Sequence, residues 1–142
     1  MVPAVVEGRC GGGPITPRRI QLSRRKGWQL PFFSRSVARP GFWGNPFLVE
    51  NWGAEMAVAL HRWAMLGQWG RVNKAWKRKT GLAIGAYTLL GLQAYFADAR
   101  RRLPELRGLS LGCWCRLGDD VPCHAQTLLT LANAPEAAHA HD

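Results

Sequence analysis

Three segments of the chain have the hydrophobic pattern of short β-strands. Apolar and polar residues alternate over residues 19–24, which is typical of a strand with one buried face. Residues 36–39 predict a second strand, ended by the turn dipeptide at 40–41 and followed by an aromatic loop at 42–47. The third segment, residues 109–115, is an apolar run of strand length. Because side chains alternate along a strand, one face of it carries Leu109, Leu111, Cys113 and Cys115.

Three other segments have helical spacing. The first begins near Trp52 and is broken by Gly67 and Gly70, a longer one ends at Pro104, and the last covers residues 123–133. Their apolar side chains recur every three or four positions: Met56, Leu60, Trp63 and Leu66 in the first, Leu89, Leu92, Phe96 and Leu103 in the second, and Leu128, Leu129 and Ala132 in the third. Residues 71–81 allow either a helix or an exposed excursion.

This order of strands and helices predicts one small α/β domain. We expect a mixed sheet flanked by helices over residues 16–134, with a Cys/His site at the C-terminal end of the last strand. Residues 1–15 include three consecutive glycines and predict a flexible leader, because ordering glycine costs much backbone entropy. Residues 135–142 are polar and predict a frayed tail.

The charge balance favours a polyanionic partner. The chain has 19 Lys plus Arg against 9 Asp plus Glu, a net charge of +10, and 7 tryptophans. Nucleic acid or a nucleotide is the simplest partner, although a solvated basic surface would have the same composition. No segment approaches the roughly 18–20 apolar residues of a membrane span, and we find no secretory signal. We therefore expect a cytoplasmic protein, with no membrane partner, whose clustered cysteines are ligands or nucleophiles rather than disulfides.

The most specific chemical motif is Cys-x-Cys-x7-Cys-His, formed by Cys113, Cys115, Cys123 and His124. The first two cysteines lie two apart on a predicted strand and point the same way, while the other pair begins the final helix. One interpretation is a tetrahedral zinc site with all four as ligands. Another is a metal-free site in which Cys123 is a low-pKa nucleophile, or Cys123 and His124 contact substrate. In the third, Cys113 and Cys115 are simply small core residues.

Short motifs along the chain resemble the family called domain of unknown function 4326, in family order over roughly residues 16–134. They are Arg19-Ile20-Gln21 with Arg24, Lys26-Gly27-Trp28, Arg39-Pro40, Trp43-Gly44-Asn45-Pro46-Phe47, Leu106-Arg107-Gly108, Leu111-Gly112-Cys113-Trp114-Cys115, and Cys123-His124-Ala125 through Ala132-Asn133. That family is common in bacteriophages and their hosts and has no settled activity. The resemblance therefore implies an architecture and a shared pocket rather than a reaction. Residues 31–36 and the basic stretch 71–80 depart from its pattern.

In that implied pocket the Cys/His motif would be joined by Arg24, Lys26, Trp28, Arg39, Trp43 and Asn45. The two arginines suit phosphate, either tryptophan offers a face for a base, and the amide of Asn45 suits a base edge. Each also has a structural interpretation, as a core side chain, a turn or a solvated charge. The leading hypothesis is a nucleotide- or nucleic-acid-binding protein that modifies its ligand. In that case Cys123 is the nucleophile or His124 the general acid/base, or a metal such as zinc activates water.

The alternative is a non-catalytic binding or inhibitory module acting on nucleic acid or a partner protein. Its phosphate contacts would come from the basic stretch, interleaved with Trp69 and Trp76: Arg71, Lys74, Lys77, Arg78 and Lys79. The same stretch also fits an amphipathic helix with solvated cations. A zinc-stapled structural domain that recruits a partner protein is a third possibility.

Overall fold

A computed structural model describes residues 16–118 and 120–135 of the chain. The expected leader, and the expected tail apart from Pro135, lie outside the described residues. Within them the element order is strand, strand, four helices, a short 3-10 turn, strand and helix, which confirms the α/β class. Among these residues no helix is both long and apolar enough to cross a membrane.

The sheet has three strands in the order β1 (Arg19–Gln21), β3 (Ser110–Cys113) and β2 (Ser34–Ser36). Both pairs are parallel, with Gln21 opposite Cys113 and Ser36 opposite Gly112. The described sheet is therefore parallel throughout, where we expected a mixed one. Each of the first two strands is followed by a connection that returns the chain to the same end of the sheet, a loop after β1 and helices after β2.

The strands are shorter than the sequence predicted, and the second is displaced. The strand expected at 36–39 lies at 34–36, because a turn begins at Ala38, whose carbonyl accepts a hydrogen bond from the N–H of Gly41 at 3.1 Å. The strand expected at 19–24 ends after Gln21, and the N–H of Leu22 makes a further hydrogen bond to the Cys113 carbonyl at 2.8 Å. Of the run at 109–115, only 110–113 is strand.

The helices are α1 (Val49–Trp52), α2 (Ala54–Met65), α3 (Trp69–Thr80), α4 (Ala86–Arg102) and α5 (His124–Ala132), with the 3-10 turn η1 at Leu103–Leu106. The basic stretch is thus helical. Gly53 divides the first expected helix in two, because its φ of +82° is a conformation that other residues rarely adopt. Gly67, with a φ of +74°, separates α2 from α3, whereas Gly70 lies inside α3 and breaks nothing.

The sequence predicted the core face of α2 only in part, since Leu60 is buried and Trp63 packs partly buried against the core as expected. Met56 and Leu66 are exposed, at 38% and 44%, and the buried positions are Ala57, Leu60, His61, Ala64 and Met65. The three-to-four spacing selected the large apolar side chains, but small alanines form much of the packed face. Alanine at a contact allows helix axes to approach closely, and α2 packs against α3, α4 and α5.

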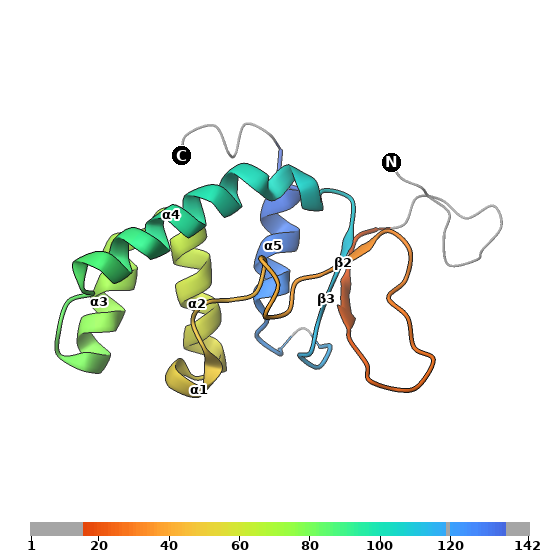
Figure 1. The fold of residues 1–142 in the computed structure, drawn as a ribbon, viewed down its shortest axis with the longest axis horizontal. Helices are drawn as coiled ribbons and strands as arrows, with labels where there is room; N and C mark the ends of the chain where they lie inside the picture. The colour runs from red at the N-terminus through yellow and green to blue at the C-terminus, as the bar shows by residue number, and fades with distance from the viewer. Residues whose placement is uncertain (1–15, 119, 136–142) are drawn as a thin grey trace.

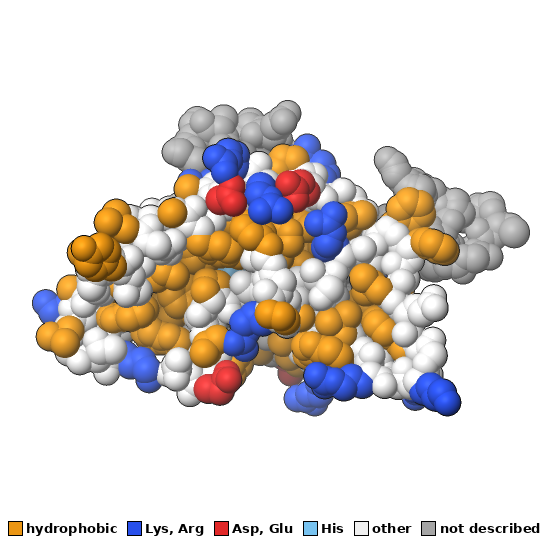
Figure 2. Space-filling view, in the orientation of Figure 1, with side chains coloured by type: hydrophobic (Ala, Val, Ile, Leu, Met, Phe, Trp, Pro, Cys, Tyr) orange, Lys and Arg blue, Asp and Glu red, His pale blue; other side chains and the backbone are white. Residues whose placement is uncertain are grey.

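The sheet is covered differently on its two faces. On one face, Leu111 and Cys113 pack into the core with α5 (Figure 1). On the other, a Cβ on Gly112 would lie 2.8 Å from Cδ2 of Leu22, so the loop after β1 packs directly on the backbone of β3. The arrangement leaves the C-terminal end of β3 beside the start of α5, where the cysteines lie. Figure 2 shows hydrophobic side chains across this view of the molecule, with Lys and Arg mainly around its edges.

Candidate functional site

Three thiols meet at the junction of β3 and α5. Cys113 is the last residue of β3, Cys115 follows two residues later, and Cys123 is the N-cap of α5. Their sulfur atoms all lie within 4.8 Å of one another, and Cys113 Sγ and Cys123 Sγ are 2.8 Å apart in a thiol hydrogen bond. Cys113 and Cys123 are buried and Cys115 is half-buried, and all three are free cysteines. This cluster is the one that the sequence motif predicted.

The thiols have opposed ionisation preferences. Hydrogen bonds from Cys113 and Cys115 lower the pKa of Cys123 far below its ordinary value, against the opposing effect of burial. The pKa of Cys113 is raised, by its hydrogen bonds to Cys115 and Cys123 and then by burial. The hydrogen bonds from the two neighbouring thiols therefore favour the thiolate form of Cys123. A thiolate is both the nucleophilic and the metal-binding form of cysteine, so the cluster suits either chemistry.

His124 is not part of the three-sulfur group. Its Nε2 lies 2.9 Å from the carbonyl oxygen of Val37 and 3.1 Å from that of Trp43. Because carbonyl oxygens only accept hydrogen bonds, Nε2 carries a proton and donates it. Of the four expected metal ligands, the structure thus brings together the three cysteines. The imidazole instead joins the start of α5 to the end of β2 and to the aromatic loop.

A second buried histidine, which the sequence did not single out, supports the first. His61 of α2 is 1% exposed, and its ring lies edge-on to that of His124 with 5.1 Å between centroids. Burial, followed by the neighbouring His124, lowers the pKa of His61 well below 6.5, so it is neutral. Its Nδ1 has no hydrogen-bond partner in the described part of the chain. Its spacing of four from Ala57 would have placed it on the correct face of α2.

A cavity of about 160 Å³, which we call the cysteine cavity, opens beside the thiols. Arg39, Asn45, Trp114 and His124 line it together with the three cysteines and the small residues of α2. Arg39 comes close because residue 44 is glycine: a Cβ on Gly44 would lie 2.9 Å from the Cα of Arg39. The glycine of the aromatic loop therefore makes room for the arginine that the sequence analysis assigned to phosphate.

The other expected substrate residues have mixed placements. Asn45 lines the cavity, but its amide holds the loop in place: Nδ2 donates to the Ala57 carbonyl at 3.0 Å, and Oδ1 accepts from the Phe47 N–H at 2.9 Å. Trp43 is a buried core residue. The guanidinium of Arg24 lies 4.3 Å from the ring centroid of Trp114, which lines the cavity, but Arg24 itself does not line it. Lys26 and Trp28 do not line it.

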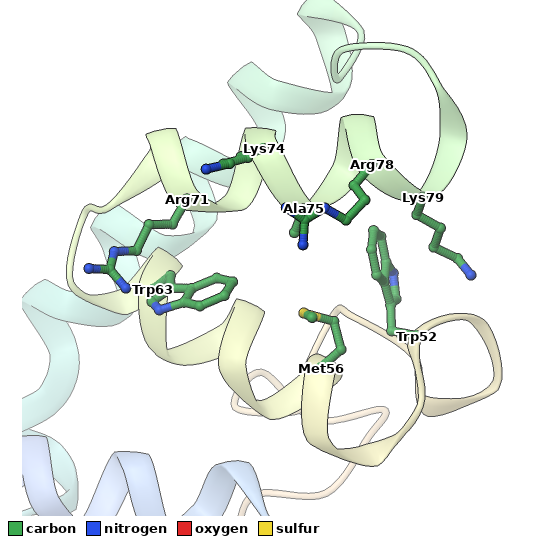
Figure 3. A pocket seen from close by; sticks show the side chains of 8 residues that line it. All are labelled: Trp52, Met56, Trp63, Arg71, Lys74, Ala75, Arg78 and Lys79. Carbon is green, nitrogen blue, oxygen red and sulfur yellow. The ribbon is translucent and has the colours of Figure 1, made fainter.

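A second hollow, which we call the basic groove, lies between α2 and α3 and has a volume of about 600 Å³ (Figure 3). It is lined by Trp52, Met56, Trp63, Arg71, Lys74, Ala75, Arg78 and Lys79. Four of the five cations expected to contact nucleic acid line this groove, and Lys77 does not. Trp69 and Trp76, the aromatic residues expected there, do not line it. The ring of Trp69 packs on that of Phe96, with 5.8 Å between centroids, and the ring of Trp76 packs on that of Trp52, with 5.5 Å between centroids.

The comparisons with known proteins agree with the resemblance carried by these motifs. No curated protein and no solved structure matches the chain. The family model described as "Domain of unknown function (DUF4326)" matches residues 20–134, a span that contains all three clustered cysteines, His124, the aromatic loop and both hollows. The chain therefore belongs to the DUF4326 family.

Proposed function

We propose that this protein holds a zinc ion on Cys113, Cys115 and Cys123 and binds the phosphate of a nucleotide or nucleic acid in the cysteine cavity. The observation that carries the proposal is the convergence of three sulfur atoms within 4.8 Å in a cavity that an arginine also lines. We place the protein in the reducing cytoplasm, where thiols stay available to a metal.

The donor set fits zinc. Zinc–sulfur bonds of about 2.3 Å in a tetrahedron require sulfur separations of about 3.8 Å, which shifts of about 1 Å would give from the present positions. Thiolate ligands favour soft or borderline ions such as zinc over magnesium or calcium. The described residues supply three thiol ligands and no fourth His, Cys, Asp or Glu within the same 4.8 Å. Three protein ligands with one open position is the pattern of catalytic rather than structural zinc sites.

The size of the cavity limits what part of a ligand it can hold. About 160 Å³ is below the roughly 300–1,000 Å³ of pockets that hold whole drug-sized ligands, so we assign a phosphate group to it rather than a whole nucleotide. Arg39 lines that volume, and Arg24 lies over Trp114, another lining residue. A guanidinium can bind two phosphate oxygens at once. The remainder of the ligand would extend over Trp114, a residue that is 44% exposed.

The chemistry available at such a site is that of a Lewis acid beside a bound phosphate. Zinc supplies charge stabilisation at its open position. The protein's residues bind and orient: Arg39 holds the phosphate, and His124 fixes the start of α5 that carries Cys123. Without a metal, the same geometry leaves Cys123 as the thiolate nucleophile, stabilised by its two neighbouring thiols.

The proposal is tested by isothermal titration of the zinc-loaded protein with adenosine monophosphate and with inorganic phosphate. We expect both to bind, and R39A to weaken binding at least tenfold. The control is R62A, which removes an exposed arginine from α2 that does not line the cysteine cavity. Equal affinities of wild type, R39A and R62A would refute phosphate binding in this cavity. Zinc without affinity for either ligand would leave a metal-stapled domain instead.

A further inference from the structure

The basic groove is a separate site from the cysteine cavity. Ala54, Ala57 and Val58 of α2 line the cavity, whereas Met56 and Trp63 line the groove. At about 100° per residue around a helix, these two sets point in opposite directions. One small ligand cannot fill both hollows, so the groove requires an occupant of its own.

In the part of the chain that the structure describes, no acidic side chain forms an ion pair with the cations of the groove. Residues 69–81 contain five Lys and Arg but no Asp or Glu. Among the described residues, the acidic partners in ion pairs are Asp98 and Glu105, and they pair with arginines of α4 rather than with α3. Glu50 and Glu55 are close in sequence to Trp52 and Met56, which line the groove, but neither makes an ion pair among the described residues. Arg71, Lys74, Arg78 and Lys79 thus form a row of charge along α3 that a polyanion would complement.

The floor and sides of the groove are aromatic and apolar. Figure 3 shows the indoles of Trp52 and Trp63 at opposite sides, with Met56 between them and the cations of α3 above. Both indoles are half-buried, and each has a cation at its face: Arg71 lies 5.9 Å from the ring centroid of Trp63, and Lys79 lies 5.5 Å from that of Trp52. Proteins hold unpaired bases by stacking them on aromatic faces, while neighbouring cations bind the phosphates of the strand.

We propose that the basic groove binds single-stranded nucleic acid, with bases stacked on Trp52 and Trp63 and phosphates on Arg71, Lys74, Arg78 and Lys79. A single strand fits better than a duplex, because the aromatic faces lie inside a hollow of about 600 Å³ that paired and stacked bases cannot enter. The inference does not depend on zinc or on the cysteine cavity.

The test measures fluorescence anisotropy of labelled oligothymidylate and oligouridylate, which separate DNA from RNA, and of a duplex of equal length. We expect the single strands to bind at least tenfold more tightly than the duplex. With four phosphates neutralised, the slope of log affinity against log salt should be about −3, at about −0.7 per phosphate. The double variant K74Q/R78Q should have about half that slope. The control R25Q/R35Q removes the same charge from exposed positions outside the groove and should change affinity far less.

The stacking contribution is tested at Trp63. Replacing it with leucine should weaken single-strand binding about tenfold, and phenylalanine should restore part of the loss because it keeps an aromatic face. Thermal unfolding of each variant separates loss of binding from loss of fold. Equal effects of K74Q/R78Q and R25Q/R35Q would overturn the inference, as would equal affinity for the duplex or binding only to vesicles of anionic phospholipid. C115S and R39A should bind the oligonucleotides normally. If C115S and R39A alone lost affinity for the oligonucleotides, the strand would bind at the cysteine cavity and not in the groove.

Discussion

The imidazole of His61 lies edge-on against the imidazole of His124, with 5.1 Å between their centroids and 73° between their planes. His124 donates from Nε2 to two backbone carbonyls, at Val37 and Trp43. Its neighbour is 1% exposed and neutral. The pair therefore fixes α2, the end of β2, the aromatic loop and the start of α5 around one point. That point adjoins the cysteine cavity, so the shape of the cavity depends on two buried rings that lie outside the three-sulfur group.

The stability of the protein should fall as the pH drops below 6.5. Burial lowers the pKa of His61 in the folded state, so protons bind the unfolded chain preferentially once the pH passes below the unfolded value of 6.5. Urea unfolding at a series of pH values measures the effect. In H61F the dependence should be shallower, because phenylalanine cannot take up the proton. An identical pH profile in H61F would contradict the neutral state assigned to His61.

Removing the His124 side chain should destabilise the fold without removing the metal. H124A leaves the carbonyls of Val37 and Trp43 without their donor, which costs about 1–3 kcal/mol for buried polar groups. H124Q should recover part of this free energy of unfolding, because its amide can donate in place of Nε2. Chemical denaturation measures the stabilities, and zinc content is measured on the folded variants. A folded H124A protein that no longer holds zinc would show that the imidazole is a ligand after all.

Gly44 should not tolerate a methyl group, whereas Gly91 should. A Cβ at residue 44 would lie 2.9 Å from the Cα of Arg39, and backbone cannot move aside cheaply, so G44A should lose about 1–3 kcal/mol. The matched change G91A lies inside α4 with nothing within 4 Å, and alanine there should add about 0.5–1 kcal/mol. Thermal and urea unfolding compare the two. If G44A were as stable as G91A, the close packing of Arg39 on the loop would be wrong.

The fold was predictable where side-chain pattern and backbone constraints agree. Cys113 and Cys115 alternate on a strand and Cys123 begins a helix, so their convergence could be predicted from spacing and from the usual ligand site at strand ends. Of the core face of α2, Leu60 was predictable but Ala57 and Ala64 were not, because alanines carry little hydrophobic signal although tight packing needs small residues there. The second strand was predicted too late in the chain, at 36–39 instead of 34–36, since Ser34 and Arg35 are polar and pair through the backbone alone.

The candidate site was also predictable in part. Arg39 and Asn45 both line the cysteine cavity, because Gly44 allows the aromatic loop to pack closely on Arg39. His61 and Trp114 were missed: one lies beside a leucine on a helix, and the other sits between two cysteines, so neither stands out from its neighbours in sequence. The cavity and the groove lie on opposite sides of α2, because α2 packs between α3 and α5. That packing depends on contacts between distant segments and cannot be predicted from local sequence patterns.

The most direct test of the account is the zinc content of the purified protein, by elemental analysis under reducing conditions. We expect one zinc per chain in the wild type and in C10S, which alters the one cysteine outside the motif. C115S should retain far less than one zinc while staying folded, since Cys115 is half-buried and contributes little to the core. A folded wild-type protein that takes up no zinc, or a C115S variant that keeps all of it, would contradict the three-thiol metal site.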